Sequence, residues 1–259
     1  MRTNTSPHPH LNVKDIEISR PLHWLALAWK DMERSPTAGV THGLILALIS
    51  GGLFWFARHD FWWIAAMLSV SMLIAPLLAT GLYDISRRLE RGDEASLMDA
   101  FHIWTCGDKR LIHFGLLLAA SCAGWLICSA ALIQWMLPAS VHTPADFLRL
   151  VVLQPEFGLF EVWVVMGALL AAPMFASTLV TIPLLMDHPT LTIQQAVHTS
   201  WRVVAMNPFA MACWAGILCV FTALGVGSAF LGLLGVVPML GHASWHAYRD
   251  LVAYDPTVH

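Results

Sequence analysis

Long apolar runs separated by short polar segments dominate the chain, and this pattern predicts a polytopic membrane protein. A helix of roughly 20 apolar residues crosses the roughly 30 Å hydrocarbon core of a bilayer. The expected fold class is therefore all-α. Six runs of suitable length predict six transmembrane helices, at approximately 40–57, 61–83, 112–137, 160–186, 209–224 and 228–248.

The last two runs share the glycine-rich stretch ALGVGSAFLGLLG and could form one kinked helix or two helices in a tight hairpin. A single helix of about 40 residues is too long for one crossing, which favours the hairpin. This pattern divides the chain into three expected parts: a cytoplasmic N-terminal segment with an interfacial helix at 1–38, a six-helix transmembrane domain at 39–248, and a cytoplasmic tail at 249–259.

The basic residues predict the orientation of these helices. All 14 Lys and Arg residues except Arg58 and Arg149 fall in the N-terminal segment, the second and fourth connections and the tail. Because basic residues stay on the cytoplasmic side, both termini are expected in the cytoplasm. The stretch GLYDISRRLERGDEASLMDAF, which follows the second run, is then the end of a helix that leaves the bilayer into the cytoplasm.

Similar motifs close the even-numbered helices, which read APLLATGLYDISRR, IPLLMDH and VPMLGHASWHAYRD. In each motif a proline precedes an apolar pair, and in the second and sixth helices an aromatic residue follows seven positions later. The prolines are Pro76, Pro183 and Pro238, and the aromatic residues, which are expected at the membrane interface, are Tyr83 and Trp245. A proline inside a helix removes a hydrogen bond and kinks it. Kinked helices can surround a cavity, but they also occur in helices that merely pack well, and the three matches could be chance.

A second motif precedes the odd-numbered helices. Each amphipathic stretch there ends near a tryptophan that suits a membrane interface, at Trp29, Trp104 and Trp201. Together the two motifs predict three copies of one unit, each consisting of an interfacial helix followed by a transmembrane hairpin.

Composition supports the membrane prediction and narrows the partners. The chain is 57% hydrophobic and 12% charged, whereas soluble domains carry about a quarter charged residues. The lipid bilayer is the expected partner, and a protein partner in a membrane complex is compatible with the sequence. A formal net charge of -3 gives no indication of a nucleic-acid partner.

Candidate chemistry is sparse. His242 and His246 stand four positions apart on one helix face, a spacing that suits two ligands of one metal or an axial haem ligand with a neighbour. Two polar residues at an interface would look the same. Copper bound by cysteine and methionine sulfur is a further option beside simple packing of these side chains. No other cofactor is indicated, and the absence of a catalytic motif argues against an enzyme.

The stretches WLALAWKDMERSP, GLYDISRRLERGDEASLMDAF and SWRVVAMNP resemble a family of uncharacterised bacterial integral membrane proteins. Some members of that family are labelled as a cytochrome c oxidase subunit. The resemblance covers most of the chain after about Val13 and implies a location in the bacterial inner membrane, but it implies no activity.

Three functional hypotheses remain. The first is an accessory, scaffold or assembly protein of a membrane complex. The second is a small-molecule permease or lipid-handling protein with a cavity between kinked helices. The third is a haem or metal protein that uses His242 and His246.

Overall fold

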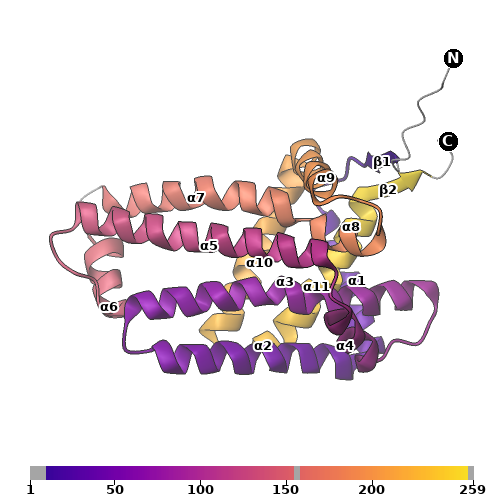
Figure 1. The fold of residues 1–259 in the computed structure, drawn as a ribbon, viewed down its shortest axis with the longest axis horizontal. Coiled ribbons are helices and arrows are strands. Elements are labelled where there is room, and N and C mark those ends of the chain that lie inside the picture. The colour runs from indigo at the N-terminus through magenta and orange to yellow at the C-terminus, as the bar shows by residue number, and fades with distance from the viewer. Residues whose placement is uncertain (1–9, 155–157, 256–259) are drawn as a thin grey trace, which may run out of the picture.

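The computed structural model describes residues 10–154 and 158–255 and shows long helices that lie side by side (Figure 1). The predicted all-α membrane class is confirmed. The long helices are α2 Pro36–Ala57, α3 Phe61–Arg91, α5 Lys109–Met136, α7 Leu159–Thr178, α10 Pro208–Gly227 and α11 Leu233–Leu251.

Short elements gather at the two ends of the bundle. Figure 1 shows four short helices at one end of the bundle, the same end at which the described chain begins and finishes. They are α1 Arg20–Arg34, α4 Leu97–Cys106, α8 Thr181–Asp187 and α9 Ile193–Met206. Helix α6 (Pro144–Phe147) and a π-helical turn, η1 (Leu148–Val152), lie at the opposite end.

A small antiparallel sheet joins the beginning and the end of the chain. Strand β1 (His10–Val13) pairs with strand β2 (Val252–Asp255), so that Val13 lies opposite Val252. We call the end of the bundle that carries this sheet the strand end.

Among the residues that the structure describes, five segments are long and apolar enough to cross a membrane: α2, α3, α5, the segment Leu159–Asp187 and α10. The predicted fourth span is divided, because α7 ends at Thr178 and α8 begins at Thr181. Helix α11 is long enough, with 19 residues, but it is not apolar enough to be counted with these five. The sixth span therefore stays a prediction.

The element order of one short helix followed by two long segments occurs three times. It is seen in α1–α2–α3, in α4–α5–α7 with α8, where α6 and η1 lie between α5 and α7, and in α9–α10–α11. This is the order that the predicted repeat requires, and the repeat itself stays a prediction.

Helix α11 packs closely against α2 and α3 because glycines remove side chains from the contacts. A Cβ atom on Gly43 of α2 would lie 2.6 Å from the Cα atom of Leu234. Gly241 of α11 faces Leu82 of α3 in a contact too tight for a methyl group. The Gly43 contact brings the backbones of α2 and α11 together, and the Gly241 contact lets the Leu82 side chain of α3 pack on the backbone of α11.

Candidate functional site

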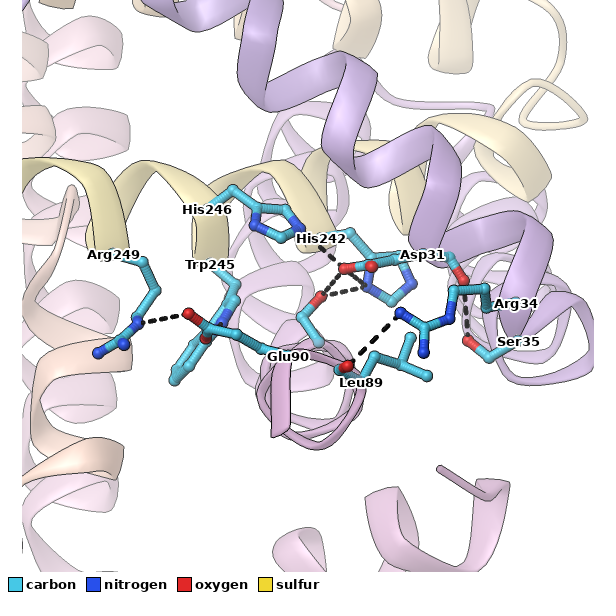
Figure 2. A network of polar contacts seen from close by, with 10 residues as sticks. Asp31, Arg34, Ser35, Leu89, Glu90, His242, Trp245, His246 and Arg249 are labelled. Atoms are coloured by element: carbon cyan, nitrogen blue, oxygen red, sulfur yellow. Dashed lines mark hydrogen bonds and ion pairs between the residues drawn. The ribbon is translucent and has the colours of Figure 1, made fainter. Parts of the chain in front are cut away.

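Four polar side chains from three helices meet at the strand end, and we call them the Asp31 cluster (Figure 2). Asp31 comes from α1, Ser86 from α3, and His242 and His246 from α11. The Oδ2 atom of Asp31 lies 2.7 Å from the hydroxyl of Ser86 and 2.8 Å from Nε2 of His246. The Ser86 hydroxyl also lies 2.7 Å from Nδ1 of His242. The cluster thereby links α1, α3 and α11.

The hydrogen-bond partners fix where the protons lie. A serine hydroxyl has one hydrogen, and Ser86 donates it to the carboxylate of Asp31. Nδ1 of His242 must then donate to the Ser86 oxygen, so the Nε2 of a neutral His242 carries a lone pair. That Nε2 atom is buried and has no hydrogen-bond partner in the described part of the chain. The cluster therefore holds one unused acceptor.

The cluster is largely buried, with His246 as its most exposed member. Ser86 and His242 are fully buried, and Asp31 is 7% exposed. Burial raises the pKa of Asp31, but hydrogen bonds from His246 and Ser86 and the nearby histidine charges outweigh it. The pKa of this carboxyl consequently lies below its ordinary value, and the group is ionised at neutral pH.

The sequence of α1 explains why a carboxylate points into the protein. Trp24, Ala28 and Asp31 are buried and follow helical spacing, so they share the face that packs on α11. Asp250 of α11 strengthens this contact, because it accepts hydrogen bonds from Arg20 at 2.8 Å and from Nε1 of Trp24 at 2.9 Å. Two carboxylates thus hold α1 against α11: Asp31, which α1 supplies, and Asp250, which α11 supplies.

A second group of buried nitrogens lies between α2, α3 and α4. Nδ1 of His42 donates to the carbonyl of Ala38 at 2.7 Å, which leaves Nε2 as an acceptor. The rings of His42 and Trp104 lie edge to face with centroids 5.0 Å apart. Neither His42 Nε2 nor Trp104 Nε1 has a hydrogen-bond partner among the described residues. Gly81 makes room for this arrangement, since a Cβ there would lie 2.6 Å from His42 Nε2.

Comparison with known proteins places the chain in a broad class. Residues 64–187 match the family described as predicted integral membrane protein (DUF2189). The resemblance to a family of uncharacterised integral membrane proteins is thus confirmed over nearly half of the chain. No curated protein and no solved structure matches the chain. Together with the apolar helices, the match identifies an all-α integral membrane protein.

The two predicted metal ligands lie in the Asp31 cluster, but they bind different partners there. His246 uses Nε2 to contact Asp31, whereas His242 uses Nδ1 to contact Ser86. Within residues 10–154 and 158–255, no group of three or more His, Cys, Asp or Glu side chains could hold a metal ion. A metal role for His242 and His246 stays a prediction.

The predicted interfacial aromatics fall into two groups. Trp29 and Trp201 are about half exposed, and their indole nitrogens donate to Glu33 and Ser177, respectively. Trp104 is half-buried against His42. Tyr83 and Trp245 are buried, so protein side chains surround them. Contact of these five residues with lipid headgroups stays a prediction.

The three motif prolines occupy different positions in their helices. Pro76 lies inside α3, and Pro238 lies inside α11. Pro183 is the third residue of α8, directly after the break between α7 and α8. Their role in kinking the helices stays a prediction.

Sequence reasoning did not identify Asp31, Ser86 or His42. For His42 a signal existed, because an ionisable residue inside a predicted span marks a site by default. For Asp31 the signal was its position on the same helix face as Trp24 and Ala28. Ser86 gave no signal, because its role depends on partners 55 and 156 positions away.

Proposed function

We propose that the chain is an accessory, scaffold or assembly protein of a membrane complex in the bacterial inner membrane, without catalytic activity of its own. The observation that carries this proposal is the Asp31 cluster. Its hydrogen bonds join three helices, and Ser86 and His242 are fully buried. Buried groups that bind one another hold helices in a fixed arrangement, which suits a scaffold better than a site that must admit a substrate.

Six membrane crossings, with both termini in the cytoplasm, form part of the proposal. The pairing of β1 with β2 supports an even number of crossings, because hydrogen-bonded strands lie on the same side of a membrane. Five segments of the described chain satisfy the conditions for a span, so α11 would supply the sixth crossing. Its 19 residues extend about 28 Å, close to the thickness of the hydrocarbon core.

The short helices offer surfaces for lipid or for a protein partner. Helix α1 buries one face on α11, while Leu22 and Trp29 on its other face are more than half exposed. Helix α9 exposes Trp201 and Met206. Large apolar side chains on the outside of an amphipathic helix suit the membrane interface or a neighbouring subunit.

Purification under mild conditions tests this proposal. The protein is extracted from its native membrane, washed at high salt and weighed intact by native mass spectrometry. We expect a stoichiometric protein partner, and we expect deletion of the chain to lower the amount of the partner's complex in the membrane. Replacement of Leu22 and Trp29 by serine would weaken a partner bound at α1, with His59→Ser, at an exposed position between α2 and α3, as the surface control.

Two results would contradict the scaffold role. One is a chain of 28.6 kDa that carries no protein partner even after cross-linking in the intact membrane. The other is deletion that leaves every membrane complex at its normal level. A small-molecule adduct in the same spectrum would favour the permease or lipid-handling alternative, and its mass would name the ligand class.

A further inference from the structure

A half-enclosed pocket of about 340 Å³ lies at the strand end, between the last turns of α3, α8 and α11. Charged groups of both signs line it, together with one tryptophan. We call it the Arg91 pocket, and its lining residues are Arg87, Glu90, Arg91, Asp187, Trp245 and Arg249.

The two carboxylates of this pocket are held in place but not saturated. Glu90 accepts from Nε of Arg249 at 3.2 Å and from Nε1 of Trp245 at 3.3 Å, and Figure 2 shows it beside both side chains. Oδ2 of Asp187 accepts from the hydroxyl of Tyr248 at 2.8 Å and lies 3.7 Å from an Nη atom of Arg249. A carboxylate offers about four acceptor positions, so both groups can still bind a further donor.

Arg91 supplies positive charge that the protein leaves unpaired. Arg87 pairs with the buried carboxylate of Asp84, but Arg91 makes no hydrogen bond or ion pair with any residue that the structure describes. It is not needed to cap α3, because Gly92 closes that helix in a left-handed conformation and donates to the carbonyl of Leu89. The guanidinium of Arg91 is therefore available to a ligand.

The depth of the pocket suits a lipid headgroup. Helix α3 has 31 residues and extends about 46 Å, close to the roughly 40–45 Å thickness of a bilayer with its headgroups. If Phe61 lies among the headgroups of one leaflet, the last turns of α3 lie among the headgroups of the other. The pocket opens among these turns.

We propose that the Arg91 pocket binds a zwitterionic phosphoethanolamine headgroup. Its phosphate would lie on Arg91 and Arg87, and its ammonium would donate to Glu90 and Asp187. A headgroup with negative charge alone would meet both carboxylates, and a choline group has no N–H to donate to them. This inference goes beyond the scaffold role and does not depend on a protein partner.

Lipid retention tests the proposal. The full-length protein is exchanged into detergent that contains equal amounts of phosphatidylethanolamine, phosphatidylglycerol and phosphatidylcholine, and bound lipids are identified by native mass spectrometry. We expect phosphatidylethanolamine to be retained preferentially. Arg91→Gln should lower its affinity about tenfold, the effect of losing one charge-assisted hydrogen bond. Arg149→Gln, an exposed arginine at the opposite end, is the matched control and should retain the lipid.

A competition experiment distinguishes the two sources of this headgroup, which are soluble phosphoethanolamine and the lipid phosphatidylethanolamine. If soluble phosphoethanolamine displaces the lipid at millimolar concentration, the pocket recognises the ester itself. If only phosphatidylethanolamine competes, the pocket recognises the lipid. Arg91→Lys keeps the charge and should retain most of the affinity, which excludes misfolding as the cause of a loss. Equal retention of the three lipids, preference for phosphatidylglycerol, or equal binding by Arg91→Gln and Arg149→Gln would overturn the proposal.

Discussion

Asp31 and His246, 215 positions apart in the sequence, are joined by a hydrogen bond of 2.8 Å between Oδ2 and Nε2. Asp31 lies in the first helix of the chain and His246 in the last. The bond therefore closes the bundle in the same region where β1 pairs with β2. Because Ser86 joins the same carboxylate, helix α3 is tied into this closure as well.

Removal of the Asp31 carboxylate should destabilise the fold. Asp31→Ala leaves the hydroxyl of Ser86 and the Nε2–H of His246 without their acceptor, in a site that water hardly reaches. Loss of one partner of a buried polar group of this kind costs about 3 kcal/mol. We expect a fall of several degrees in the apparent unfolding temperature in detergent. Glu33→Ala, on the exposed side of α1, should change it by less than one degree, and equal effects of the two changes would contradict the assignment.

The same carboxylate should make stability depend on acid. The pKa of Asp31 in the folded protein lies below its ordinary value of 3.8. The stabilisation of the fold by the ionised carboxylate is therefore fully present above pH 3.8. It is lost as the pH falls through the lower, folded pKa. We expect no change from this group between pH 7 and pH 5 and a decline below about pH 4.

Comparison of wild type with Asp31→Asn isolates this effect from other carboxyls with lowered pKa, such as Asp99 and Asp108. The measurement is the unfolding midpoint in detergent from pH 7 to pH 3. The difference between the two proteins should shrink below pH 4, and a constant difference over the whole range would rule out a titrating Asp31.

Close contact between α2 and α11 makes a strong prediction for one glycine. A Cβ on Gly43 would lie 2.6 Å from Leu234 Cα and 2.7 Å from the Leu233 carbonyl oxygen, and backbone atoms cannot move aside. Gly43→Ala should therefore cost about 2 kcal/mol by overpacking. Gly52 lies in the same helix, and a Cβ there would have no atom within 4 Å, so Gly52→Ala should be neutral or slightly stabilising. Thermal unfolding of both variants checks the contrast.

The apolar pattern predicted most of the long helices, because burial in lipid requires about 20 apolar residues in a row. The stretch after the predicted span at 61–83 was expected to be the end of a helix that leaves the bilayer, and it is helical up to Arg91. Helix α3 continues to Arg91, because charged residues do not end a helix that leaves the membrane. Gly92, with φ 83°, ends it. The break at 179–180 inside the fourth span was not foreseen, although Pro183 lies three residues after it.

The candidate site could be predicted only in part. His242 and His246 stood out by their spacing, but the partners that define their chemistry come from α1 and α3. Contacts over 156 and 215 positions are set by helix packing and leave no local pattern in one sequence. The same holds for β1 and β2, each only four residues long and paired across almost the whole chain.

The crossing of the membrane by α11 can be tested with an impermeant thiol reagent. If α11 spans the bilayer, the connection between α10 and α11 lies on the side opposite the strand end. We therefore expect Ser228→Cys, at an exposed position in that connection, to be labelled in intact cells. The background is a protein whose five native cysteines are replaced by alanine.

Two further positions calibrate this experiment. His59→Cys, between α2 and α3, should be labelled in intact cells, whereas Asp93→Cys, after α3, should be labelled only once the membrane is opened. If Ser228→Cys behaved like Asp93→Cys, α11 would enter the bilayer without crossing it. The pairing of β1 with β2 would then require one of the other five helices to remain on one side, because hydrogen-bonded strands cannot be separated by a bilayer.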